Sequence, residues 1–259
     1  MPSFAANLAW LFKDMPLANK MELVATLGFK HAEFQFPYEV DAQVMRDMLS
    51  TNNLSMSLIN APAGDYAAGD RGIAAIEGRE DEFRRAIERG LEYADAIGCR
   101  AVHVMSGVVE EADREIAVSK YVDNLKIAAR LAAPAGIDIL VEPINGVDVP
   151  GYLIQRATQA RAVMAMVDEP NVFLQFDAYH ALVNGEDPCE GLRANFDVIR
   201  HMQIAGYPGR HEPGSGDDKP TEFFELCDTL GYTGTIGCEY VPAGSTLEGL
   251  TWASPYGIG

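Results

Sequence analysis

Four oxygen-bearing side chains stand at or near the ends of apolar runs in the second half of the chain. They are Glu142 after DILV, Asp177 after VFLQF, Gln203 in IRHMQIA and Glu239 in TIGCEY. If these runs are neighbouring parallel strands, the four side chains meet at the carboxyl end of one sheet. Three carboxylates this close repel one another unless a cation lies between them. One acidic residue at a strand end is usually a helix cap, but four oxygen ligands on consecutive strands favour a metal site.

The ligand types predict which metal such a site binds. Carboxylate and amide oxygens are hard ligands that suit Mg²⁺ or Mn²⁺. Zn²⁺ fits less well, because no cysteine is among the four residues and histidine is sparse nearby. His180 follows Asp177 by three residues and is predicted to bind a substrate oxygen or to tune a neighbouring carboxylate. His103, inside AVHVM, is either a substrate ligand or a hydrogen-bonded core histidine.

Two arginines lie in the two long loops, residues 60–79 and 207–219. Arg71 and Arg210 are candidates to bind a substrate carboxylate, because the planar guanidinium pairs with it through two hydrogen bonds. The alternative for each is a solvated surface charge. Asn7 is a short polar residue in an apolar run, and we predict that it faces the same site and binds substrate.

Eight short apolar segments are predicted strands. Most are dense in large apolar residues rather than cleanly alternating, as parallel strands covered on both faces are. They span residues 4–9, 31–36, 54–60, 101–105, 138–142, 172–177, 199–205 and 235–240.

Helical patterns fill the gaps between the strands. They span residues 16–27, 41–51, 80–97, 112–133, 158–167, 189–196 and 221–230, and the segment 189–196 has the weakest pattern. Asp41 is a candidate N-terminal cap. Four of the helices end in a glycine followed shortly by a strand, as in AIGCRAVHV, which is the expected punctuation between a helix and the next strand.

Eight repeated strand–helix units in 259 residues predict an α/β protein with one (β/α)₈ TIM-barrel domain spanning residues 1–259. No G-x-G-x-x-G follows the first strand, which argues against an open dinucleotide-binding sheet. Both long loops follow strands, so they should lie on the carboxyl face where barrel enzymes carry their sites.

Net charge limits the partners of this protein. The formal charge is −18, which argues against nucleic acid and against an anionic membrane surface. A small anionic substrate remains compatible, since one local cation overrides the global sign. Four scattered cysteines and the lack of a signal-peptide pattern predict reduced thiols and a cytoplasmic location. No apolar stretch is long enough for a membrane span.

Aromatic residues are candidates for a pocket wall or for the core. Trp10, Phe12, Phe36 and Trp252 fit either role, and core packing is the usual one. The apolar ending TWASPYGIG is predicted either to cover the barrel mouth or to join a subunit interface in a homo-oligomer.

Several segments together carry a family resemblance over nearly the whole chain: FAANLAWLF, GDYAAGDRGIAAIEGREDEF, RAVHVMSG, VEPIN, FDAYH, HMQIAGYPGRHEPGSG and GLTWASPYG. They resemble the hydroxypyruvate isomerase family of xylose-isomerase-like barrels. The resemblance implies that Glu142, Asp177, Gln203 and Glu239 bind the metal and that Glu142 and Glu239 are the acid/base pair. Many relatives carry histidine where this chain has Gln203, which favours the hydroxypyruvate branch. Glu77 stands where the family often has proline, in a loop.

The implied reaction interconverts hydroxypyruvate and tartronate semialdehyde through a cis-enediolate, with the metal as Lewis acid and the two glutamates moving protons. A 2-oxo-tetronate isomerase is the nearest alternative, because one extra carbon changes pocket discrimination by only ~1–3 kcal/mol. A ketose 3-epimerase is a weaker alternative. A metal nuclease related to endonuclease IV conflicts with the negative charge, and an inactive sugar-acid-binding barrel conflicts with an intact ligand set.

Overall fold

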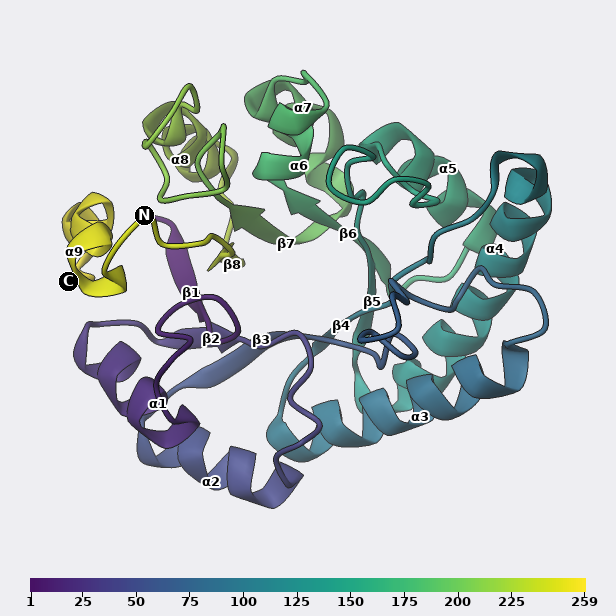
Figure 1. Cartoon of the computed structure of the whole chain (residues 1–259), viewed down its shortest axis with the longest axis horizontal. Coiled ribbons are helices and arrows are strands. Elements are labelled where there is room, and N and C mark those ends of the chain that lie inside the picture. The colour runs from purple at the N-terminus through teal and green to yellow at the C-terminus, as the bar shows by residue number, and fades with distance from the viewer.

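The computed structural model describes residues 1–259 and shows a closed barrel of eight parallel strands in chain order (Figure 1). Strand β1 pairs with β2 on one side and with β8 on the other, which closes the sheet. The predicted (β/α)₈ barrel is therefore confirmed. The strands are β1 (Ser3–Asn7), β2 (His31–Glu33), β3 (Ser55–Asn60), β4 (Ala101–His103), β5 (Asp138–Val141), β6 (Val172–Asp177), β7 (Ile199–Ile204) and β8 (Thr235–Cys238).

Each predicted strand overlaps one observed strand, but most observed strands end earlier than predicted. Strand β2 ends at Glu33 and β4 at His103, because the chain turns into the loops of the mouth and leaves the backbone ladder there. Glu142 and Glu239 consequently stand one residue beyond β5 and β8 rather than inside them.

The helices surround the barrel in Figure 1. They are α1 (Leu17–Thr26), α2 (Ala42–Thr51), α3 (Glu80–Ile97), α4 (Arg114–Ala132), α5 (Ala157–Val167), α6 (Ala178–Val183), α7 (Pro188–Asn195), α8 (Pro220–Leu230) and α9 (Thr246–Gly249). Helix α3 has the predicted bounds, and Gly98 ends it with φ 76°, a left-handed conformation that glycine adopts without strain. Asp41 caps α2 as predicted, accepting hydrogen bonds from two backbone N–H groups. Helix α6 was not predicted. None of the helices is long and apolar enough to cross a membrane.

Apolar packing is concentrated outside the barrel wall rather than inside it. A cluster of 62 buried residues joins the outward faces of the strands to the helices, whereas the separate cluster on the inward faces contains only Leu58, Ala101 and Leu140. Side chains two residues apart share a face, so Asn60, His103 and Glu142 stand above these three. The upper interior of this barrel is thus polar, where most barrels of this type stack branched apolar residues.

The C-terminal segment packs along the outside of the barrel beside β1 and α8. The rings of Trp252 and Tyr256 contact Phe4 and Phe224, and the backbone N–H of Gly259 donates to the carbonyl of Leu27 at the end of α1. The prediction that this tail covers the mouth is wrong, because its aromatic rings are held in the outer core. Trp252 accordingly packs on the outer core, and the pocket that it helps to line lies beside Glu212 and Ser245.

Candidate active site

Two buried carboxylates, Glu142 and Asp177, and the partly buried Glu239 meet at the mouth of the barrel. Glu142 follows β5, Asp177 ends β6 and Glu239 follows β8, so the order of the strands brings them together. His180, in the first turn of α6, places Nε2 3.7 Å from Glu142 Oε1 and 3.6 Å from Asp177 Oδ2. One ligand atom from each of Glu142, Asp177 and His180 lies within 4.8 Å of the others. This spacing can hold a single metal ion.

Arg210 is the cation that contacts this cluster. Its Nη2 lies 2.7 Å from Glu239 Oε1 and 3.2 Å from Asp177 Oδ2. The guanidinium is held between the rings of Trp10 and Tyr179, at 5.0 and 4.8 Å from their centroids. Arg210 has φ 55°, a strained conformation for a side-chain-bearing residue that is common at functional sites. The structure thus places Arg210, unlike most loop arginines, inside the site.

Asp177 has two separate roles in the geometry. Its Oδ1 accepts the backbone N–H of Tyr179 at 2.9 Å and so caps α6. Its Oδ2 faces Arg210 and His180. A helix cap and a metal ligand are therefore not competing explanations at this position, because the two oxygens of one carboxylate can serve one role each.

The hydrogen bonds around His180 assign its tautomer. Asn145 Oδ1 accepts the N–H groups of Val147 and Asp148, so the amide nitrogen of Asn145 faces His180 Nδ1 at 2.6 Å. Nδ1 consequently accepts, and in the neutral ring Nε2 carries the hydrogen. Burial lowers the pKa of His180 well below its ordinary value, and the positive charge of Arg210 lowers it further. A protonated Nε2 aimed at the carboxylates suits the binding of a substrate oxygen better than metal ligation.

The three carboxyl groups carry more negative charge than the one arginine beside them can neutralise. Burial raises the pKa of Glu142 well above its ordinary value, and repulsion from Glu239 and Asp177 raises it further. Burial also raises the pKa of Asp177 and of Glu239, while Arg210 partly offsets the shift in both. An additional cation among these groups would favour their charged forms. The donor set is oxygen-rich, buried and short of positive charge, and it fits a hard divalent cation.

Gln203 lies on the inward face of β7, below the carboxylates. Its Nε2 donates to Glu33 Oε1 at 3.0 Å and to Glu239 Oε2, and its Oε1 accepts from Gln175 Nε2 at 2.6 Å. The amide nitrogen, and not the oxygen, therefore faces Glu239. A ligand role for Gln203 stays a prediction that requires the amide to turn over.

Glu33 is the centre of a buried network that the sequence did not reveal. Its carboxylate accepts from Asn7 Nδ2 at 2.7 Å, from His201 Nε2 at 2.7 Å and from Gln203. Gly237 on β8 faces the same carboxylate, and a Cβ at that position would clash with both of its oxygens. The sequence did carry one sign of this network. Polar residues occur two positions apart within a predicted strand, as Glu33 and Gln35 or His201 and Gln203 do, and residues spaced in this way share one face of a strand.

The remaining predicted site residues lie at different depths. The side-chain amide of Asn7 donates to Glu33 and accepts from the backbone N–H of Ala9. Asn7 therefore belongs to the hydrogen-bond network of Glu33, and its predicted contact with substrate stays a prediction. His103 Nδ1 lies 3.3 Å from Glu142 Oε2, and its role as a substrate ligand stays a prediction. Arg71 stacks on Tyr66 at 4.0 Å within its own loop and makes no ion pair with the carboxylates. Tyr66 in turn packs against Phe36.

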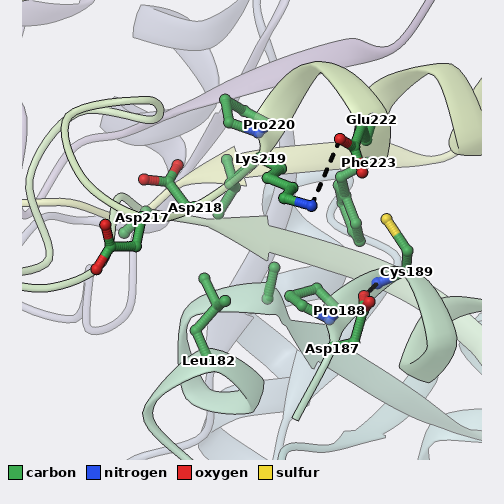
Figure 2. Close-up of a pocket in the computed structure, with 13 residues that line it drawn as sticks. Leu182, Asp187, Pro188, Cys189, Asp217, Asp218, Lys219, Pro220, Glu222 and Phe223 are labelled. Carbon is green, nitrogen blue, oxygen red and sulfur yellow. Dashed lines mark hydrogen bonds and ion pairs between the residues drawn. The ribbon is translucent and has the colours of Figure 1, made fainter. Parts of the chain in front are cut away.

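A separate cavity of about 210 Å³ lies between α6, the start of α7 and α8 (Figure 2). Leu182 and Phe223 line its apolar part. Its acidic groups hold local backbone: Asp187 Oδ1 accepts the N–H of Cys189 and Asp218 Oδ2 that of Gly214, both at 2.7 Å. None of the predicted site residues lines this cavity.

Comparison with known proteins agrees with this fold. A family model described as a xylose isomerase-like TIM barrel matches residues 21–256. The 2-oxo-tetronate isomerase of Cupriavidus necator is 44% identical over 99% of each chain, and the hydroxypyruvate isomerase of Escherichia coli is 37% identical over 99% of this chain and 100% of its own. A crystal structure from Brucella melitensis, described as an AP endonuclease of family 2, has a TM-score of 0.96 at 42% identity and covers 99% of each chain.

These relatives match the chain from end to end and bear out the resemblance drawn from its motifs. The enzymes among them carry names of isomerases that act on short oxo acids. The chain belongs to the xylose isomerase-like TIM barrel family, and it is an isomerase.

Proposed function

We propose that the protein is a divalent-metal-dependent isomerase that moves the carbonyl of a short hydroxy-oxo acid by one carbon. The observation that carries this proposal is the cluster of Glu142, Asp177 and Glu239, two buried carboxylates and one partly buried, with Arg210 as their only positively charged partner. Glu142, Asp177 and Glu239 would hold the ion, with Gln203 as a fourth ligand after its amide turns. A divalent cation there supplies Lewis-acid stabilisation of negative charge on two adjacent substrate oxygens.

Glu142 and Glu239 are the proposed acid/base pair. One carboxylate removes the proton from the hydroxyl-bearing carbon, which gives a cis-enediolate. The hydroxyl proton passes to the former carbonyl oxygen, and the other carboxyl, protonated at the start, delivers its proton to the former carbonyl carbon. Their raised pKa values suit this task, because a carboxyl group that titrates closer to neutral pH both takes and returns a proton readily. In the reverse reaction the two glutamates exchange roles.

Three side chains are proposed to orient the substrate. His180 Nε2–H points at the space between Glu142 and Asp177, where it would donate to a reacting oxygen. Arg210 fixes Glu239 through their ion pair and offers positive charge at the same place. Arg71 lies on the loop after β3 with its guanidinium half-buried against Tyr66, and it is our candidate for the substrate carboxylate because its pairing there is only with backbone carbonyls.

Two substrates fit this reaction. The motifs favour hydroxypyruvate, whereas the 44% identical relative is named for 2-oxo-tetronate. Both acids carry a carbonyl at C2 and a hydroxyl at C3, so the same site can isomerise either one. A ketose 3-epimerase lacks a comparable supporting observation in this chain.

The test is an assay of both acids with metal-stripped protein before and after addition of Mg²⁺ or Mn²⁺. We expect turnover only with metal. Equal turnover in a chelator would exclude the metal role, and no turnover of either acid would exclude the substrate class. The description of the Brucella structure suggests a nuclease, but 38 acidic against 20 basic residues disfavour DNA binding. An assay with abasic duplex DNA checks this, and we expect no cleavage.

A further inference from the structure

Several buried polar atoms without hydrogen-bond partners belong to β3, to β4 and to the segment after β4, and one, Gln175 Oε1, belongs to β6. Asn60 Oδ1, both ring nitrogens of His103 and Ser106 Oγ make no hydrogen bond. The three residues are 6%, 1% and 1% exposed. An unpaired buried polar group costs about 1–3 kcal/mol, and native proteins keep few of them. Several together therefore indicate a place that a ligand completes.

Two of these residues, Asn60 and His103, are neighbours in the barrel. Asn60 and His103 are partners across β3 and β4, so their backbones lie ~4.8 Å apart and their side chains share the inward face. Ser106 follows His103 by three residues, and its backbone N–H donates to the hydroxyl of the fully buried Tyr152 at 3.1 Å. Gln35 extends the group toward β2: its carbonyl accepts the N–H of Asn60, and its amide is also without a hydrogen bond of normal geometry.

The group adjoins the carboxylates but stands on other strands. Figure 1 shows β2, β3 and β4 across the barrel from β6, β7 and β8. His103 Nδ1 is 3.3 Å from Glu142 Oε2, without the geometry of a hydrogen bond. A substrate whose reacting carbons lie among the carboxylates would therefore have His103 close by, with Asn60 beside it across β3 and β4.

The polar atoms of Asn60, His103 and Ser106 suit a hydroxyl group of the ligand. It contains amide, imidazole and hydroxyl atoms and no lysine or arginine, and Glu142 beside it would repel a second carboxylate. A hydroxyl donates one hydrogen bond and accepts others, which matches the acceptor Asn60 Oδ1 together with donors from His103 or Ser106. The two oxygens that react would already be engaged at the carboxylate cluster.

We infer that Asn60, His103 and Ser106 form a subsite for a substrate hydroxyl that lies one carbon beyond the two reacting carbons. This inference rests on the proposed function and deepens it. Hydroxypyruvate has no such hydroxyl, since its only hydroxyl reacts. A four-carbon 2-oxo acid carries one at C4, so the subsite makes the four-carbon acid the better substrate.

The test compares Asn60→Leu and Ser106→Ala with the unchanged enzyme on both acids. We expect kcat/KM for the four-carbon acid to fall by about 10- to 100-fold, because a site built for a hydroxyl loses its discrimination when a partner is removed. The value for the three-carbon acid should change by less than about threefold, within the effect of one neutral hydrogen bond. Equal losses on both acids, or no loss on either, would overturn the subsite.

Ser57→Ala is the matched control. Ser57 is on the same strand β3, but its Oγ donates to the carbonyl of Ala32 on the outer side. The control should lower the thermal midpoint slightly and leave the ratio of the two kcat/KM values unchanged. Asn60→Leu should keep or raise the midpoint, since it removes an unpaired buried group. A large drop in that midpoint would indicate a structural role instead.

A binding measurement separates this inference from the proposed function. Calorimetry with the metal-loaded protein would use glycerate and erythronate, which are three- and four-carbon hydroxy acids that lack the ketone. Tighter binding of erythronate that disappears in Asn60→Leu supports the subsite even if neither oxo acid turns over. Equal affinity for the two acids, or no binding of either, overturns the subsite whatever the turnover shows.

Discussion

Glu142 and Glu239 have the same side chain but different surroundings, and their environments explain why two carboxylates can work as a pair. Glu239 is paired with Arg210 at 2.7 Å. Glu142 has only histidine neighbours, His103 and His180, at 3.3 and 3.7 Å. Burial raises the pKa of both groups, and the like charge of Glu239 adds to the shift of Glu142. Each carboxyl therefore responds to the state of the other.

Glu142→Gln and Glu239→Gln should each lower kcat by about 10²- to 10⁴-fold, the usual contribution of general acid–base catalysis. The shape of glutamine matches that of glutamate, so circular dichroism and the thermal midpoint should show an intact fold. Glu111→Gln, at a side chain that is 89% exposed, is the control and should have ordinary activity. Activity within tenfold of normal in either active-site variant would defeat the two-glutamate mechanism.

At the scale of elements, short helices and strand ends position the site. Helix α6 is only six residues long, and it begins at the cap made by Asp177. This helix carries His180 back over the mouth, where Asn145 fixes the ring. The site thus depends on one carboxylate that starts a helix and also faces the proposed ion.

Two substitutions separate the roles of Asp177. Asp177→Asn keeps an oxygen for the cap but loses the charge, so it should abolish metal binding with little loss of stability. Asp177→Ala should also lose about 1 kcal/mol of stability, the usual effect of removing a cap. Calorimetric metal titration and denaturant unfolding measure the two effects. Asp187→Ala, at the cap of α7, should lower stability alone, and equal stability of the two Asp177 variants would contradict the cap.

Gly237→Ala tests the close contact between β8 and the interior network. The added Cβ would overlap the Glu33 carboxylate, which three hydrogen bonds hold in place. We expect a loss of about 1–3 kcal/mol in the free energy of unfolding, as overpacking of a close-packed interior gives. Gly244→Ala is the control, because a Cβ there meets no atom within 4 Å. Equal denaturation midpoints for the two variants would show that Glu33 moves aside freely.

At the scale of the whole molecule, the chain has a large negative charge, and part of that charge is concentrated at the barrel mouth. The chain carries −18 overall, and three of its carboxylates surround one arginine at the mouth. Such an arrangement opposes folding of the metal-free protein at neutral pH. Binding of a cation to the folded state alone stabilises it by about 2.7 kcal/mol at a hundred times the dissociation constant.

Metal-free protein should become less stable as the pH rises from about 5 to about 8. Burial raises the pKa of Asp177 to about 6 and that of Glu239 to about 8, above the value of about 4 in an unfolded chain. The folded state therefore holds protons that the unfolded chain has released, and stability falls as pH rises through this window. Thermal midpoints of metal-free wild type and Glu239→Gln should diverge in favour of the variant with rising pH, and a constant difference would contradict the shift.

The sequence by itself determined the architecture and most of the mouth. These features could be predicted from local patterns, because apolar segments, glycines at helix ends and caps such as Asp41 depend on residues that are close together in the chain. The order of the units in turn placed Glu142, Asp177 and Glu239 on one edge. The short helix α6 was not predicted, because six residues are too few to show the period of an amphipathic helix.

The tertiary structure alone decided which polar residues meet inside the barrel. Glu33 and His201 are 168 positions apart and bond at 2.7 Å, and Asn60 meets His103 only because β3 pairs with β4. It also turned the amide nitrogen of Gln203 toward Glu239 and packed Trp252 against Phe4 rather than over the mouth. The physical reason is that hydrogen-bond direction and burial depend on atoms brought together by barrel closure, which no local pattern in the sequence encodes.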